Sequence, residues 1–591
     1  MFLRHFFVAF IVLLLVRSVS AEPPKFEEFK PNRPVLDLPV TDKKMVLAHF
    51  MTGCFVRDPR PGDYRDRFLS YEDFAPDGIT AHLGGESQIL PIDYYFNFEK
   101  SSVEAAAFHI RAAKKVGIDG FQFFYPFPPN ERFQNNFDNI IIDFFNAAET
   151  VDIDFNFSLC ICTPPAHIDE DEKIAVFAKG FRRILDAVGK GNRFWAKTPD
   201  GRFLTHLWHG DALANAVREA GGDIRGKADA VIPRIAFAYE KLGHAIGIDL
   251  ACAMYIRYVD DQNYVDRVLE YFPIVWNWTE NLRHEKAWFD LAKRCKEQKR
   301  AFMQGVYPDY YGSKLYRKGD TTWSMFHFLH DVKKLSADEV EHDYYYSGVT
   351  DIYLNYLNRM LETDSPLVSF ITYNDYQEGH HAAPELNHNF GFAILFNHYK
   401  NIWLGTPEKN DKEFAVLAYK KYRHDIVPEP FNIVFLPKVA ELAMFDPSTD
   451  DFINIVVFLK QPATVFLNGK EVGTAKGTGD IEVFKVPLAK GRVKLEIKRN
   501  NEPVITLAGT EWITDKPFRT DRLTYYLSSE CDNYYAELFG KDAPRYFLQQ
   551  YVEDADGVPY WKKGKSVGVR YADGTIGTAT TIVPGKTFDW P

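Results

Sequence analysis

The sequence predicts an α/β protein, a (β/α)8 barrel of the TIM type followed by a C-terminal antiparallel β-sandwich. Over roughly the first 380 of its 591 residues, short apolar runs alternate with helical patterns, as in a parallel barrel with insertions. No glycine-rich phosphate loop follows any of these runs, which counts against a nucleotide-binding fold. After about Pro428 the helical patterns largely vanish and alternating strands replace them.

The barrel strands are predicted where apolar runs have the composition of strands buried on both faces. Seven runs meet this description, and in chain order they are Met45 to Phe50, Gly120 to Tyr125, Phe155 to Cys162, Phe203 to Trp208, Ile274 to Trp278, Ala301 to Tyr307 and Leu367 to Thr372. An eighth strand is expected within His244 to Tyr255, where the pattern is blurred.

Helical patterns fill the spaces between these runs. The clearest begins at the capping box Ser101-Ser-Val-Glu104, continues over Ala105 to Val116 and ends at Gly117. The other predicted helices are Lys173 to Val188, Ala228 to Leu242, Glu280 to Glu297 and Gly348 to Leu361.

The C-terminal region has the pattern of a β-meander. Thr464 to Val472 is predicted as a hairpin, because Asn468-Gly469 is a strong two-residue turn signal between apolar residues. Further strands are expected at Val483 to Val486 and Val493 to Ile497. We therefore assign residues 22–428 to the barrel and residues 429–591 to an accessory β-sandwich region.

The first 21 residues are interpreted as a signal peptide. Arg4 precedes an apolar run from Phe6 to Val16, and the small-residue pattern Val19-Ser20-Ala21 follows. The run is well short of the ~20 residues that span a bilayer, and no later stretch approaches a span. The expected location is secreted or periplasmic, with no membrane span in the mature form.

The amino-acid composition limits the classes of partner and cofactor that the protein is expected to bind. The chain has 70 basic and 81 acidic residues, a formal charge of −11, and no stripe of Lys or Arg, so no nucleic acid is expected to bind. Six cysteines are too few for a disulfide scaffold at this length. Cys160-Ile-Cys162 lacks the spacer of a zinc knuckle or redox pair, which favours buried, inert thiols. We expect a monomer without metal or cofactor.

The chemistry is predicted to follow the last barrel strand. Leu367 to Thr372 runs directly into Asp375 and Glu378, and the C-terminal ends of barrel strands carry the active site in this fold. Hydrolysis of a glycoside needs one carboxylic acid and one carboxylate, and these two residues are the catalytic candidates. A turn or helix cap is the structural alternative for such a pair.

Substrate-binding candidates are polar and aromatic residues near the ends of the strands. Aromatic faces stack on the apolar side of sugars, and His or Asn can bond to their hydroxyls, although core packing accounts for many such residues. The candidates are His49, Trp208, Trp276, Asn277, Trp278, Tyr310, Tyr373, Asn374, Tyr376 and His380.

Five segments in the same order resemble glycoside hydrolase family 71, the α-1,3-glucanases or mutanases. They are Lys44 to Gly53, Ala113 to Phe121, Trp276 to Trp278, Gly305 to Tyr311 with Trp323 downstream, and Thr372 to His380. The last matches the family signature aromatic-Asn-Asp-Tyr-x-Glu-x-His, whose Asp and Glu are taken as the catalytic pair, here Asp375 and Glu378. The chain departs from the family at Asn277, where Asp is usual, at Tyr373, where Trp is usual, and at Ser158 to Cys162, which supplies no carboxylate.

The resemblance implies an endo-acting hydrolase of α-glucan, specifically α-1,3-glucan, with a polysaccharide or oligosaccharide as partner. It also implies an inverting mechanism, for which we expect Asp375 as acid and Glu378 as base. An α-mannan or other α-glycan hydrolase on a related barrel and a non-catalytic carbohydrate-binding protein stay open as alternatives. Because every catalytic candidate precedes Phe431, removal of residues 431–591 is expected to affect stability or attachment to polysaccharide more than hydrolysis.

Overall fold

The computed structural model describes residues 40–55, 102–278, 285–311, 345–376, 378–384, 388, 390–426, 445–509, 512–517 and 522–539, with short strands at 315–317, 325–326, 340–341, 568–570 and 576–578. The predicted signal peptide, Ser101 of the capping box and Trp323 lie outside these residues. None of the described helices combines the length and the apolar character needed to cross a membrane.

The predicted barrel is confirmed. Eight parallel strands close on themselves in the order β1-β11-β7-β6-β5-β4-β3-β2. The strands are β1 (Met45–Phe50), β2 (Gly120–Pro126), β3 (Asn156–Cys162), β4 (Phe203–Trp208), β5 (Leu250–Tyr255), β6 (Ile274–Trp276), β7 (Ala301–Val306) and β11 (Leu367–Phe370). The barrel closes where β1 pairs with β11, in the register Met45 to Leu367.

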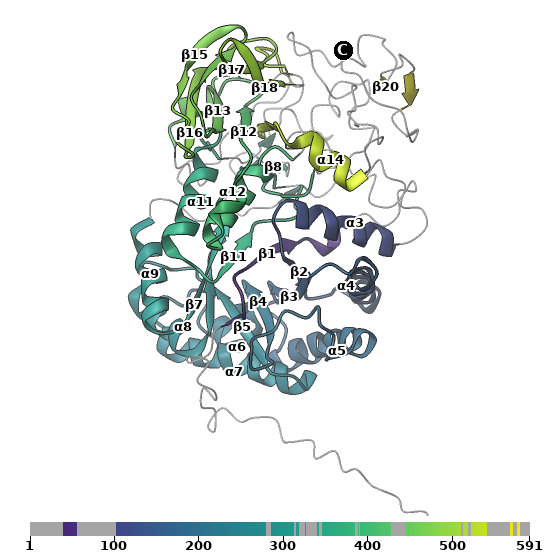
Figure 1. Cartoon of the computed structure of the whole chain (residues 1–591). Helices are drawn as coiled ribbons and strands as arrows, with labels where there is room; N and C mark the ends of the chain where they lie inside the picture. The colour runs from purple at the N-terminus through teal and green to yellow at the C-terminus, as the bar shows by residue number, and fades with distance from the viewer. Residues whose placement is uncertain are drawn as a thin grey trace, which may run out of the picture.

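Helices surround the barrel, and the sandwich lies beyond α11 and α12 (Figure 1). The helices are α3 (Ser102–Lys115), α4 (Glu131–Val151), α5 (Glu170–Val188), α6 (Asn215–Glu219), α7 (Ala228–Ile246), α8 (Gln262–Tyr271), α9 (Glu285–Glu297), α11 (Asp351–Thr363) and α12 (Ala393–Trp403). They overlap each of the five predicted helices. The structure adds α4, α6, α8 and α12 to that set.

Alternate residues of each barrel strand join two different cores, as the two-residue period of a strand requires. In β1, Val46 and Ala48 pack with residues of the surrounding helices, whereas Met45 and Leu47 pack inside the barrel with residues such as Met303. His49 continues the inward series at the C-terminal end of β1, where it is buried. This alternation predicts which residue of each strand lies closest to the barrel mouth.

The C-terminal region forms the predicted β-sandwich. Two antiparallel sheets have the strand orders β16-β13-β12-β19 and β15-β14-β17-β18. Their strands are β12 (Phe414–Tyr419), β13 (Phe452–Phe458), β14 (Ala463–Leu467), β15 (Lys470–Ala475), β16 (Ile481–Pro487), β17 (Lys494–Arg499), β18 (Glu502–Ala508) and β19 (Tyr525–Ser528). Asn468 and Gly469 form the β14–β15 turn with φ of 49° and 75°, as expected for a type I′ hairpin.

The sandwich begins earlier in the chain than the boundary predicted after residue 428. Its strand β12 pairs with both β13 and β19. Leu417 and Tyr419 of β12 face the sandwich core, while Val416 and Ala418 belong to the same core as the barrel helices. Because both faces are buried, the sequence of β12 has the appearance of another barrel strand.

The described cysteines, Cys160, Cys162, Cys252, Cys295 and Cys531, are all buried free thiols. Burial raises the pKa of Cys252 and of Cys295 to about 12 and raises that of Cys160 as well. Since the thiolate is the reactive form of cysteine, the buried Cys160 is a poor nucleophile, as predicted.

Candidate active site

The segment that follows β11 folds back on itself at the C-terminal end of the barrel. The Asp375 N–H donates to Thr372 Oγ1 at 2.9 Å, and the N–H groups of Glu378 and Gly379 donate to Asp375 O at 3.3 and 3.2 Å. Gly379 has a φ of +68°, a conformation that favours glycine. This turn places the side chains of Asp375 and Glu378 near each other.

The two carboxylates and one histidine converge. Carboxylate oxygens of Asp375 and Glu378 and a ring nitrogen of His380 all lie within 4.8 Å of one another. Glu378 Oε2 is 3.0 Å from His380 Nε2. The Glu378 side chain is 23% exposed, whereas Asp375 is buried. One carboxylate is therefore partly accessible to solvent and the other is buried beside it.

His380 is fixed by its surroundings. It is fully buried, and its ring centroid lies 5.6 Å from that of Tyr310 and 6.1 Å from that of Trp278. Within the part of the chain that the structure describes, His380 Nδ1 has no hydrogen-bond partner. With a proton on Nε2, His380 donates to Glu378 and orients that carboxylate.

Tryptophans form a wall next to the carboxylates. The Trp278 ring lies 4.9 Å from His49, 5.6 Å from Trp208 and 5.5 Å from Trp276. Trp208 and Trp278 are half-buried, whereas Trp276 is fully buried and donates from Nε1 to Leu207 O at 3.3 Å. The first two can present a ring surface to a sugar, and Trp276 supports them from the barrel interior.

Two buried histidines lie on the inner side of the same mouth. Burial, together with His206 and His380, lowers the pKa of His49 to about 3, although the nearby Glu378 opposes the shift. Burial alone lowers the pKa of His206 to about 3, and its Nδ1 lies 3.1 Å from Ser158 Oγ. Both rings are therefore neutral near pH 7 and can serve there as hydrogen-bonding groups but not as cations.

These shifts predict that acid destabilises the fold. The unfolded chain protonates each ring near pH 6.5, whereas the folded chain resists protonation down to about pH 3. Stability is then fully present above pH 6.5 and falls as the pH drops toward 3. We expect His206→Asn to reduce the proton uptake on unfolding between pH 6 and 4 by about one proton.

Denaturant unfolding midpoints measured from pH 7 to pH 4 test this prediction. The exposed His244 supplies the control, because His244→Asn removes a ring that already lies in solvent in the folded protein. An unchanged pH dependence in His206→Asn would contradict the assignment of a buried, neutral ring.

Besides Trp276, four predicted substrate-binding side chains are buried and make contacts within the protein. Tyr373 is fully buried, and its hydroxyl donates to His109 O at 3.2 Å. Asn374 clamps the backbone of Met51, which donates to Oδ1 at 2.7 Å and accepts from Nδ2 at 3.1 Å.

Asn277 and Tyr376 complete this group. Asn277 is buried and accepts from the Gly305 N–H at 2.6 Å. The buried Tyr376 ring lies 4.9 Å from that of His381. The contacts of all four side chains shape the segments around the carboxylates rather than a surface open to a sugar. Tyr310 differs, because it is half-buried and stacks on Tyr345 at 4.4 Å.

The structure adds a polar cluster that the sequence analysis did not single out, at the ends of β4 and β5. Arg257 lies 3.2 Å from buried Asp211 and also contacts His209 Nδ1. The His209 ring is 4.6 Å from Trp208 and 5.3 Å from Tyr255, so the cluster continues the tryptophan wall. Burial raises the pKa of Asp211, and burial with Arg257 lowers the pKa of His209 to about 4. In the sequence, the polar residues that follow Trp208 are the only feature that could have indicated this cluster.

Two described sets of side chains have ligand atoms close enough together for a metal ion. One is Asp375, Glu378 and His380, where the histidine already bonds to the glutamate. The other comprises His424, Asp425 and Asp451, where His424 Nδ1 lies 2.7 Å and Arg423 lies 3.3 Å from the Asp451 carboxylate. In each set, therefore, at least one of the possible ligand atoms already interacts with another protein side chain.

No protein-family model and no curated protein matches the chain. Among solved structures, the GH99 endo-α-mannosidase from Bacteroides thetaiotaomicron is similar at 11% identity and a TM-score of 0.40, over 61% of this chain and 98% of that one. A protein described as glycoside hydrolase-like is similar at 14% identity and a TM-score of 0.36, over 61% and 93%.

The β-glucuronidase of Bacteroides uniformis is similar at 12% identity and a TM-score of 0.35, over 71% of this chain and 44% of that one. Similarities this weak add nothing to the strand order described above.

Proposed function

We propose that the chain is a glycoside hydrolase in which Asp375 and Glu378 form the catalytic pair. The observation that carries the proposal is the convergence of these two carboxylates at the C-terminal mouth of a closed barrel, one buried and one partly exposed. Glycoside hydrolysis needs two carboxyl groups in different protonation states. Different environments for two neighbouring carboxyl groups are the usual way to separate those states.

The roles follow from exposure and contacts. Burial favours the protonated form of a carboxyl group, so the buried Asp375 is assigned as the acid that protonates the leaving oxygen. Glu378 is more exposed and accepts a hydrogen bond from His380, so it is assigned as the carboxylate that acts on the anomeric carbon or on water. Trp208 and Trp278 supply the aromatic surface for the sugar ring.

The spacing of the pair bears on stereochemistry. An inverting enzyme holds its carboxyl groups about 6.5–9.5 Å apart to admit a water, and a retaining enzyme about 5–5.5 Å apart. One oxygen of Asp375 lies within 4.8 Å of one oxygen of Glu378, which bounds the approach of their closest atoms and not the separation of the two carboxyl groups. Because this close approach is nearer to the shorter range, we favour retention, with Glu378 as nucleophile, whereas the family resemblance implies inversion.

α-Glycans, and α-1,3-glucan first, are the proposed substrates. The aromatic wall supports a carbohydrate ligand of neutral character, and the resemblance of Thr372 to His380 to the α-1,3-glucanase signature supplies the linkage. α-Mannan is the alternative that shares the same site.

Proton NMR during the first minutes of hydrolysis tests the function and the mechanism together. We expect α-1,3-glucan oligosaccharides to release the α-anomer first, since two displacements at one carbon restore its configuration. The panel includes α-mannan and β-linked glucans as comparisons. Release of the β-anomer first would instead indicate the inverting mechanism. Glycan binding with no product from any member would identify a non-catalytic binding protein.

A further inference from the structure

We propose that the β-sandwich is part of the catalytic unit, because Asp309, Lys420 and Thr524 act together as positioning residues for Glu378. This inference rests on the proposed function. It assigns to the sandwich a role in setting the geometry of the carboxylate pair.

Asp309 is the centre of the arrangement. It follows β7 in the barrel and is fully buried. Its Oδ2 accepts from Lys420 Nζ at 2.7 Å, from the Thr524 N–H at 2.6 Å and from Thr524 Oγ1 at 2.7 Å. Lys420 directly follows β12, and Thr524 directly precedes β19, so both donors belong to the sandwich.

The segment that carries Asp309 also contacts the site. Asp309 Oδ1 accepts from the Tyr310 N–H at 2.9 Å. The Tyr310 ring lies 5.6 Å from that of His380, which bonds to the Glu378 carboxylate at 3.0 Å. The Tyr311 N–H donates to Glu378 O at 3.2 Å. Asp309 is therefore tied to both the backbone and the side chain of Glu378.

The sandwich also touches the catalytic turn directly. A Cβ added to Gly379 would lie 2.6 Å from Leu523 Cδ2 and 2.9 Å from the Tyr311 backbone nitrogen. Leu523 is the residue before Thr524, so the segment that leads into β19 packs against the turn that carries the two carboxylates. This second contact reaches the turn independently of Asp309.

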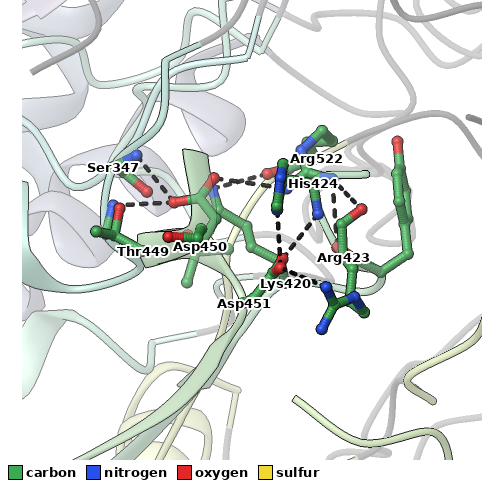
Figure 2. A network of polar contacts seen from close by, with 12 residues as sticks. Ser347, Lys420, Arg423, His424, Thr449, Asp450, Asp451 and Arg522 are labelled. Atoms are coloured by element: carbon green, nitrogen blue, oxygen red, sulfur yellow. Dashed lines mark hydrogen bonds and ion pairs between the residues drawn. The ribbon is translucent and has the colours of Figure 1, made fainter. Parts of the chain in front are cut away.

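A wider buried network holds the donors in place (Figure 2). Lys420 Nζ also donates to Arg522 O at 2.8 Å, and Arg522 lies 3.5 Å from Asp450 Oδ2. Asp450 Oδ1 in turn accepts from the N–H groups of Ser347 and Gly348 at 3.1 and 2.9 Å. Burying an ion pair costs desolvation free energy, so this network is weak evidence for added stability. What it can contribute to the site is a fixed geometry.

Thr524→Val is the informative variant, because it removes one hydroxyl donor at nearly constant volume and keeps the backbone N–H. We expect kcat for the best glycan to fall about 10-fold to 100-fold with KM nearly unchanged, as for a small misplacement of a catalytic group. Thr524→Ser, which keeps the hydroxyl, is expected to stay within about twofold of wild type.

Thr350→Val is the matched control. Thr350 is equally buried at the junction between barrel and sandwich, and it accepts from Asn454 Nδ2 at 2.8 Å, but it does not contact Asp309. We expect kcat of this variant to stay near wild type. Equal losses in Thr350→Val and Thr524→Val, or no loss in Thr524→Val, would overturn the inference.

Hydrogen–deuterium exchange supplies a readout that needs no turnover. Amides in residues 307–311 and 378–384 should exchange faster in Thr524→Val than in wild type or Thr350→Val. If the wild-type protein hydrolyses no glycan, the proposed function fails while this measurement still decides the coupling. Unchanged exchange in both segments would reject it.

Discussion

Asp375→Asn and Glu378→Gln are each expected to lower kcat by about 10²–10⁴-fold, the usual contribution of a single acid or base. An amide of the same shape cannot donate or accept the proton that the reaction needs, and it is a poor nucleophile. Glu378→Gln keeps an oxygen that can accept from His380 Nε2, now 3.0 Å from the carboxylate, so the local packing should persist. Glycan affinity and unfolding midpoints should therefore stay close to wild type.

The measurement is release of reducing ends from soluble α-glucan, with glycan binding followed by calorimetry in the same variants. Asp260→Asn is a suitable control, because Asp260 is an exposed carboxylate in the loop after β5 at the same end of the barrel. Near-wild-type turnover in both site variants would remove Asp375 and Glu378 from the mechanism.

Removal of residues 431–591 is expected to abolish hydrolysis of soluble oligosaccharide, which reverses the expectation from the sequence. The deletion takes away both strands that pair with β12 and exposes Leu417 and Tyr419. It also takes away Thr524, which supplies two of the donors to Asp309. We expect a poorly soluble product with less than about 1% of wild-type turnover, since the site and the core are disrupted together.

A shorter truncation, after Phe539, keeps both sandwich sheets. It therefore separates the effect of losing the sandwich from the effect of losing the residues after Phe539. Circular dichroism and oligosaccharide hydrolysis should be compared for the two truncated proteins. A soluble, folded protein lacking residues 431–591 that hydrolyses oligosaccharide at the wild-type rate would show that the sandwich is an accessory domain.

The sequence predicted the barrel because its strands carry a strong local signal. Runs such as Phe203 to Trp208 and Leu367 to Thr372 are apolar on both faces, and the structure places strands there. The same property concealed the start of the sandwich, since β12 is also buried on both faces. The cap of α8 was not predicted either: Asp261 accepts from the Tyr264 N–H at 3.0 Å.

The site was predictable to the extent that its residues are neighbours in the chain. Asp375, Glu378 and His380 share one short turn, so the signature brought them together without knowledge of the fold. The same proximity made Tyr373 and Asn374 substrate-binding candidates, and in the structure their side chains contact the surrounding protein. No pattern could have found Asp309 with Thr524, because the two residues are 215 positions apart and Thr524 lies in no motif.

The pairing of β1 with β11 cannot form until most of the barrel has been synthesised. Met45 is made early, but its partner Leu367 follows more than 300 residues later. At ~5–20 residues per second, that interval lasts roughly 15 to 60 s. Until β11 emerges from the ribosome, β1 has one unsatisfied edge, and unpaired edges recruit other strands. The nascent chain therefore needs protection from aggregation for most of the time that it takes to make the barrel.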